Sequence, residues 1–205
     1  MAVGDAMLLS AMGEQSRSEM DKQLGELMLY VAAKCEGLRS FGAVKLNKIL
    51  FYADFLAYDR LGRSITGAVY QKLQHGPAPK RLLPVRRRLL KQKDAAMRVE
   101  SLFVGGAEKR LFALRKPDLT LFSAEEIAIT DEIIELCSDL TATEVSAVSH
   151  QLAGWKFAKL GEEIPYFTIH LPDEVEPLSK SELKRAEAVA DRIASGVEGQ
   201  QRRVS

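Results

Sequence analysis

Cysteine and histidine are the residue types best suited to nucleophilic or metal chemistry, and their spacing in this chain supports neither. The 205 residues include two cysteines, Cys35 and Cys137, and three histidines, His75, His150 and His170. No histidine lies four residues from another, and none stands beside a cysteine pair, so a zinc site has little support. A Cys35–His75 or Cys137–His150 dyad stays open, although neither cysteine lies in a sequence typical of a nucleophilic turn. We expect free, buried thiols, no metal and no cofactor.

Asp54 is the carboxylate with the most unusual surroundings. Steps of 100° along a helix over residues 44–61 place Asn47 and Asp54 among apolar side chains. Asp54 is either an acid or partner-binding group in a pocket, or a structural group that forms an ion pair or a hydrogen-bond hub, with Arg63 or Lys72 as candidate partners. A buried charge persists only when it is paired, which favours the structural interpretation. On that interpretation Asp54→Asn strands its partner and costs about 3–5 kcal/mol.

The same steps of 100° predict a solvent-facing side for this helix. It groups four charged residues, namely Lys45, Lys48, Asp59 and Arg60. The helix is otherwise apolar nearly all round, which indicates a central, buried element.

A basic helix over residues 79–93 is the clearest charged feature. Its cations are Lys80, Arg81, Arg86, Arg87, Arg88, Lys91 and Lys93. Such a row suits nucleic-acid phosphates. However, the cations are spread over more than one face, and aromatic side chains that would stack on bases are missing. A solvated face, or a face for the protein's own acidic half, is the commoner outcome.

The net charge of +1 hides an asymmetry between two blocks. Residues 79–116 hold twelve Lys/Arg and three Asp/Glu, whereas residues 117–176 hold two and thirteen. The blocks either face each other or offer charged surfaces to partners. Trp155, the single tryptophan, is either an interface residue or part of the core.

The expected architecture is mainly α (α+β), a compact helical domain with a short strand and a β-hairpin. Start signals fit capping boxes at Ser123-x-x-Glu126, Thr141-x-x-Glu144 and Ser179-x-x-Glu182. We predict helices from Ser18 to about Cys35 and over 44–61, 79–93, 124–138, 142–150 and 180–195. A strand is expected over 65–73, breakers over 75–79, and a hairpin over 97–104 and 109–114. No segment is apolar enough to span a membrane and no signal peptide is evident, so we expect a cytoplasmic protein.

Several motifs in this order resemble the Panacea domain, also called the SocA-like antitoxin domain. The most specific is the helix Lys45-Leu46-Asn47-Lys48-Ile49-Leu50-Phe51-Tyr52-Ala53-Asp54. It is followed by Gly62-Arg63-Ser64-Ile65-Thr66-Gly67, Tyr70-x-Lys72 and His75-Gly76-Pro77-x-Pro79. Farther on come Leu140-Thr141-Ala142-x-Glu144-Val145, Ser149-His150, Trp155-Lys156 and Gly161-Glu162-Glu163-Ile164-Pro165-Tyr166.

The resemblance implies an antitoxin of a bacterial or phage toxin–antitoxin pair, which neutralises its toxin by direct protein contact and without catalysis. Some relatives instead deliver a toxin to a protease. It also implies that the shared motif is structural, with Asn47, Asp54 and Lys72 forming a buried polar brace. The other motif residues given this structural role are Lys48, Tyr52, Gly67, Gly76 and Pro77.

Partner contacts are then expected on the variable surface of the chain. The candidates are the hairpin tip, the tails, the basic helix (Lys80, Arg81, Arg86, Arg87, Arg88 and Lys91) and Trp155. The partner would be a protein toxin encoded nearby, and a nucleic-acid-binding regulator that uses the basic helix is the alternative. We expect a flexible tail over 1–17, the domain over 18–172, and a C-terminal helix with a disordered tail over 173–205.

Overall fold

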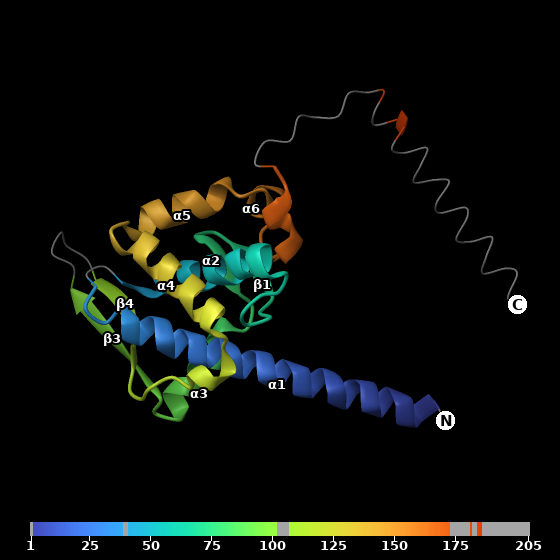
Figure 1. Ribbon diagram of the computed structural model, residues 1–205, viewed down its shortest axis with the longest axis horizontal. Coiled ribbons are helices and arrows are strands. Elements are labelled where there is room, and N and C mark those ends of the chain that lie inside the picture. Colours follow the sequence, from blue (N-terminus) through green and yellow to red (C-terminus); the bar gives the residue numbers. More distant parts are fainter. Residues whose placement is uncertain (1, 39–40, 102–106, 173–180, 182–183, 186–205) are drawn as a thin grey trace, which may run out of the picture. The chain divides into compact units, whose positions relative to one another are not determined.

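A computed structural model describes residues 2–38, 41–101, 107–172, 181, 184 and 185 (Figure 1). The chain divides into two compact units, residues 1–173 and 174–205. All elements below belong to the first unit. In the second, the described residues 181, 184 and 185 are helical, and the rest of the helix expected over 180–195 lies outside the described residues. None of the described helices is long and apolar enough to cross a membrane.

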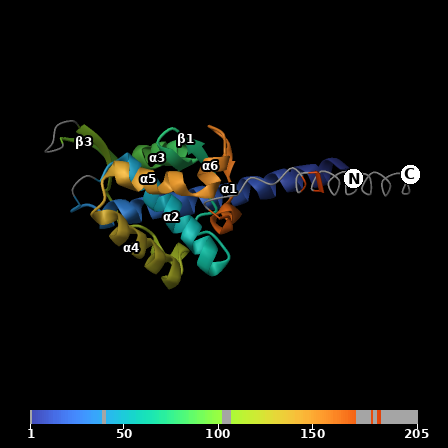
Figure 2. The same ribbon diagram turned by 90° about the horizontal axis from the view of Figure 1, so that it is seen from above.

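Two helices form the centre of the domain. α1 (Ala2–Lys34) buries Leu24, Leu27, Met28 and Val31, at the spacing that the sequence predicts for one apolar face. α2 (Ala43–Leu61) contacts α1, α4, α5 and β2. Figure 2 shows α4 on one side of α2 and the sheet of β1 on the other. α2 ends at Gly62, whose φ of 71° allows its amide to cap the helix on the Tyr58 carbonyl.

The structure corrects two expectations for these helices. α1 begins at Ala2 and not at Ser18, because the preceding residues are mostly good helix formers and Ser18 makes no cap that would end them. On α2, Asp59 and Arg60 are exposed as expected, but Lys45 and Lys48 are each only 1 % exposed. The helix is covered on that side as well, because α5 and β2 both pack against it.

A three-stranded antiparallel sheet has the order β2-β1-β5, with β1 (Tyr70–Leu73) in the middle. Tyr70 pairs with Pro79 of β2 (Gly76–Pro79) and with Ile164 of β5 (Glu163–Ile164). Residues 75–79 were expected as a breaker, but four of them form β2. Its two prolines are tolerated because β2 is an edge strand.

The remaining elements follow the predicted order. α3 (Leu82–Lys91) leads to the hairpin of β3 (Ala95–Ser101) and β4 (Ala107–Ala113), whose tip at 102–106 lies outside the described residues. α4 (Ala124–Ser138) and α5 (Ala142–Gln151) begin at the predicted capping boxes, both of which are formed. Three short helical segments complete the order, η1 (Leu119–Leu121), α6 (Ala153–Phe157) and η2 (Tyr166–His170). The mainly α fold with a small β element is confirmed.

Candidate functional site

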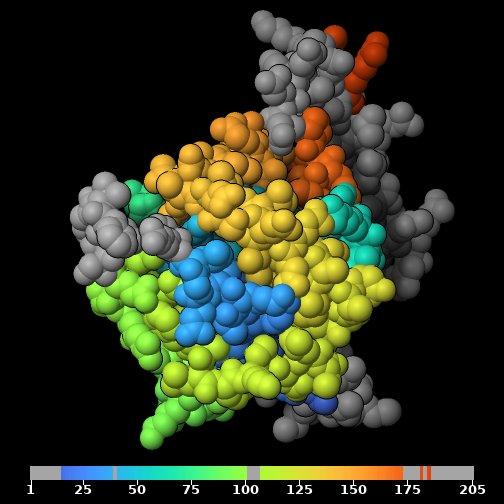
Figure 3. All heavy atoms as spheres, turned by 60° about the vertical axis from the view of Figure 1, so that its left-hand side comes forward, coloured from blue at the N-terminus to red at the C-terminus, as the bar shows by residue number. Residues whose placement is uncertain are grey.

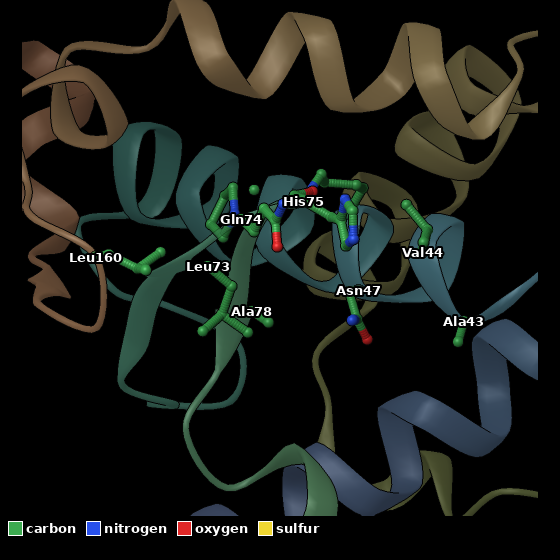
Figure 4. Close-up of a pocket in the computed structure, with 11 residues that line it drawn as sticks. Ala43, Val44, Asn47, Leu73, Gln74, His75, Ala78 and Leu160 are labelled. Atoms are coloured by element: carbon green, nitrogen blue, oxygen red, sulfur yellow. The ribbon is translucent and has the colours of Figure 1, made fainter.

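Motif residues gather around a cleft of about 420 Å³ at the start of α2. Figure 4 shows Val44 and Asn47 coming from α2, Gln74 and His75 from the turn between β1 and β2, and Leu160 from the opposite side. We call this the motif cleft. It is lined by Ala43, Val44, Asn47, Lys48, Leu73, Gln74, His75, Gly76, Pro77, Ala78 and Leu160.

Lys48 is the one charged residue in this lining. Its ammonium donates to the backbone carbonyl of His75 at 2.5 Å, and it forms no ion pair within the described part of the chain. Burial lowers its pKa from 10.5 to about 8, since a low-dielectric setting disfavours the charged form. Lys48 therefore ties α2 to the β1–β2 turn through a neutral acceptor.

Gly76 makes room for the Lys48 ammonium. Its φ is +100°, which side-chain-bearing residues rarely adopt. A Cβ at this position would lie 2.1 Å from Lys48 Nζ and 2.8 Å from Ser149 Oγ. The glycine is thus required by its backbone conformation and by its neighbours.

A stack of side chains lies close to the motif cleft. Lys72 Nζ is 3.9 Å from the centre of the Trp155 ring, and the His150 and Trp155 rings stack with centroids 3.9 Å apart. Burial lowers the pKa of His150, and the positive charges of Lys48, Lys72 and His75 lower it further. His150 Nε2 and Trp155 Nε1 are buried and have no hydrogen-bond partner among the described atoms. Trp155 is half-buried and packs against the core.

Asp54 is fully buried and is held by neutral groups. Its carboxylate accepts hydrogen bonds from the Thr66 amide at 2.8 Å, the Thr66 hydroxyl at 2.5 Å and the Tyr70 hydroxyl at 2.7 Å. Burial raises its pKa to about 6, although the hydrogen bonds from Thr66 and Tyr70 act in the opposite direction. Asp54 is therefore a hydrogen-bond hub, one of the two structural roles expected, and it forms no ion pair among the described residues.

The proposed brace of Asn47, Asp54 and Lys72 is not formed as one unit. Lys72 lies over Trp155, and Asn47 lines the motif cleft with its Oδ1 buried and without a described partner. Arg63, the other partner considered for Asp54, pairs with Glu126. Sequence reasoning missed Thr66 as a hydrogen-bond donor to Asp54, because helical periodicity does not reveal how the loop after α2 folds back onto that helix.

Tyr52 and Gly67 complete the motif residues. The Tyr52 hydroxyl donates to the Val145 carbonyl at 2.9 Å and so connects α2 to α5. Gly67 has a φ of +65°, and its missing Cβ leaves space for Met20 of α1. Pro77 is buried within β2. All of these positions serve packing between elements.

The cations of the basic helix divide into two groups. Lys80 pairs with Glu163 at 2.8 Å, Arg81 pairs with Asp21 at 2.5 Å, and Arg88 donates to the Asp21 carbonyl at 2.7 Å. These three hold α3 against α1 and β5. The other group has no partner among the described residues and consists of Arg86, Arg87, Lys91 and Lys93.

The two charge blocks are not each other's main partners. Of the described ion pairs, Lys80–Glu163 alone joins residues 79–116 to residues 117–176. Acidic residues of the second block pair instead with α1 and α2, as in Lys34–Asp131 and Arg60–Glu132.

Neither cysteine forms the dyads that the sequence left open. Cys35 and Cys137 are buried, and no described hydrogen bond joins either thiol to a histidine. Burial raises the pKa of Cys35 to about 12 and also raises that of Cys137, so both are neutral thiols near pH 7. Within the described residues, no group of three or more His, Cys, Asp or Glu side chains is placed to hold a metal ion.

Comparison with known proteins identifies the family. No curated protein and no solved structure matches the chain. The family model for the antitoxin SocA-like, Panacea domain matches residues 46–156, which run from α2 through α6. Gly161 to Tyr166, the last of the quoted motifs, lies beyond this match. Since the match spans more than half of the 205 residues, this chain belongs to the SocA-like Panacea domain family.

Proposed function

We propose that this protein is an antitoxin that binds a protein toxin encoded nearby and neutralises it by direct contact, without catalysis. The family match over residues 46–156 is the observation that carries the proposal. Membership of this family suggests that the chain acts in the cytoplasm by binding a protein partner. Delivery of the toxin to a protease is a second mode of the same activity.

The contacts of the motif residues support a binding role. Lys48, Tyr52 and Asp54 are each engaged with backbone or hydroxyl groups of neighbouring elements. The two thiols are buried and neutral, so they are poor nucleophiles. Motif side chains that make intramolecular contacts stabilise the fold. The partner is then recognised by the exposed surface around them.

Co-expression with the neighbouring reading frame tests the proposal. A host that expresses the neighbouring gene alone should stop growing, and a second plasmid with this chain should restore growth. The two products should also copurify as a complex of fixed stoichiometry. A Gly76→Val variant, which meets Lys48 and Ser149, serves as the misfolded control. If the native chain neither binds nor rescues against any adjacent product, the proposal is wrong.

The two modes of neutralisation differ in the fate of the toxin. Simple occlusion leaves the toxin at a constant level after synthesis is stopped, in complex with this chain. Delivery to a protease shortens the toxin's half-life only when this chain is present. A pulse-chase measurement with and without the chain separates the two modes.

A nucleic-acid-binding role is the second candidate. It is favoured by the four cations Arg86, Arg87, Lys91 and Lys93, which have no internal partner among the described residues. Four phosphate contacts predict that log K falls with log salt with a slope of about −3 to −4. Filter binding at two salt concentrations checks this, and no binding at low salt rules the role out.

A further inference from the structure

A second, smaller groove lies away from the motif cleft, between α4 and α5. Figure 3 shows these two helices next to each other on one face, α4 in yellow and α5 in orange. We call it the α4–α5 groove. It has a volume of about 150 Å³ and is lined by Tyr52, Ile133, Leu136, Cys137, Leu140, Val145 and Val148.

The lining of the α4–α5 groove is apolar throughout. The hydroxyl of Tyr52 is already bound to the Val145 carbonyl, and burial keeps the Cys137 thiol neutral. Leu136 is 62 % exposed and Val148 is 51 % exposed, so the two form an open apolar rim. Apolar side chains that surround a groove at the surface are typical of sites for another molecule.

The size of the groove favours a protein side chain over a small molecule. Sites for small ligands measure about 300–1,000 Å³. A volume of about 150 Å³ holds one aliphatic or aromatic side chain. The groove is therefore suited to a single apolar residue that a partner protein inserts at the centre of a larger interface.

Two exposed charges on α4, close in sequence to Leu136, give the chemistry of that partner. Glu135 and Asp139 are exposed and form no ion pair within the described part of the chain. They lie in the last turn and at the C-cap of α4, whose last turn has no basic residue. Lys45 is buried at this end and offsets the helix dipole by donating to the Ser138 carbonyl, but it forms no ion pair with either carboxylate in the described structure. The two exposed carboxylates therefore call for Lys or Arg on the partner.

We propose that the α4–α5 groove is the docking point for the toxin, and that it receives an apolar side chain flanked by Lys or Arg. This inference rests on the proposed antitoxin function and names its contact surface. It places recognition on α4 and α5, and not on the basic helix or Trp155.

A second copy of this chain is the competing occupant. α3 presents Leu83, which is 47 % exposed, beside Arg86 and Arg87, which have no ion pair in the part of the chain that the structure describes, and so it has the required chemistry. However, α3 of one copy in the groove of the next is a head-to-tail contact. Such a contact leaves a free groove at one end and a free helix at the other, and it grows into open chains unless it closes a ring.

Binding of the adjacent toxin to full-length variants tests the proposal. Leu136→Glu blocks the groove. The double variant Glu135→Lys/Asp139→Lys reverses the charge of the two exposed carboxylates on α4. Leu119→Glu is the matched control, because Leu119 is an apolar residue 42 % exposed on another element. Calorimetry should show binding weakened at least about tenfold by the first two variants and unchanged by the control. Circular dichroism verifies that all variants are folded.

Each result is decisive. If the toxin binds both groove variants with native affinity, the antitoxin function stands and the α4–α5 groove is not the docking point. Concentration-dependent self-association that Leu136→Glu abolishes also overturns the proposal, because a second copy then occupies the groove.

If no adjacent product binds the native chain, the proposed function has failed, and a defined peptide decides the groove alone. The probe is a synthetic helix with two leucines flanked by arginines, compared with the same helix carrying alanines. Shifts of α4 and α5 amide signals by the leucine peptide only, lost in Leu136→Glu, support the groove. Equal shifts by both peptides, or none, overturn it.

Discussion

Replacing Asp54 with asparagine should alter the pH dependence of stability more than stability itself. Burial raises the pKa of Asp54 from 3.8 to about 6, even though Thr66 and Tyr70 donate hydrogen bonds to it. A pKa difference of this size between the unfolded and folded chain corresponds to about 3 kcal/mol. No cation among the described residues offsets the buried charge, so the cost appears whenever Asp54 is ionised.

The direction follows from proton binding. A carboxyl with a raised pKa in the folded state holds its proton there more tightly than in the unfolded chain. Its contribution to stability is therefore fully present below about pH 4 and is lost as the pH rises through about 6. Asparagine does not titrate, so Asp54→Asn should gain about 3 kcal/mol relative to the native chain between about pH 4 and pH 7.

Hydrogen bonds set the difference in stability between the variant and the native chain at low pH, where Asp54 is protonated. Asparagine keeps an acceptor for the Thr66 amide, and its amide group faces the hydroxyls of Thr66 and Tyr70, which can accept. Rearranging these bonds costs about 1–2 kcal/mol at low pH. At about pH 7 the variant should then be more stable than the native chain by about 1–2 kcal/mol. A stranded ion-pair partner would instead cost about 3–5 kcal/mol.

Urea unfolding followed by circular dichroism measures the difference across this pH range. Other carboxylates titrate in both proteins, so their contributions cancel in the comparison. Asp139→Asn, which removes an exposed carboxylate without an ion pair in the described structure, is the control for the loss of one surface carboxylate. The reasoning is refuted if Asp54→Asn is destabilised equally at both ends of the range.

Three further predictions concern the motif cleft. Gly76→Ala should lower the free energy of unfolding in urea by about 3 kcal/mol. Gly161→Ala is its control and should cost about 1 kcal/mol, because Gly161 also has a positive φ but has open space where the Cβ would lie. Equal costs would contradict the contact with Lys48. Lys48→Met should raise the free energy of unfolding by about 1–2 kcal/mol near pH 7. Burying the Lys48 ammonium, whose pKa is lowered to about 8, costs the native chain about 3 kcal/mol, and the variant avoids this cost but loses one hydrogen bond. The native chain should gain stability from about pH 8 to pH 10 and the variant should not. Trp155 fluorescence should titrate with a midpoint below 6.5 as His150 gains its proton, and His150→Asn should abolish the transition.

Local signals allowed most helices to be predicted from the sequence. Some helix ends depend on only a few neighbouring residues, so they can be recognised without knowledge of the fold. Examples are the capping boxes at Ser123 and Thr141 and the left-handed conformation of Gly62. The start of α1 was missed because a good capping residue such as Ser18 can also lie inside a helix. Residues 76–79 were missed as a strand because two prolines are acceptable only at a sheet edge, which the sequence does not reveal.

The environment of single side chains was harder to predict. Helical steps place Lys48 beside Asp59 and Arg60, but burial depends on which elements cover each part of α2, and the sheet covers the end with Lys48. The same uncertainty explains Asp54, whose position in the core was predicted and whose hydroxyl partners were not. The α4–α5 groove was not predicted either, because Leu136 and Val148 fit an ordinary apolar helix face until the packing of both helices is known.

Lys48 and Asp54 are two of the three buried charged residues of α2, and both hold the segment that forms the β1–β2 hairpin. Asp54 binds Thr66 in the loop before β1 and Tyr70 at the start of β1, and Lys48 binds the His75 carbonyl in the β1–β2 turn. Neutral partners at two points along α2 fix the register of the sheet on the helix, whereas apolar contacts alone allow sliding. Because β1 also carries Lys72 to the Trp155 stack, the two charges position the elements on that side of the domain. α5 belongs to the same arrangement, because its His150 stacks on Trp155.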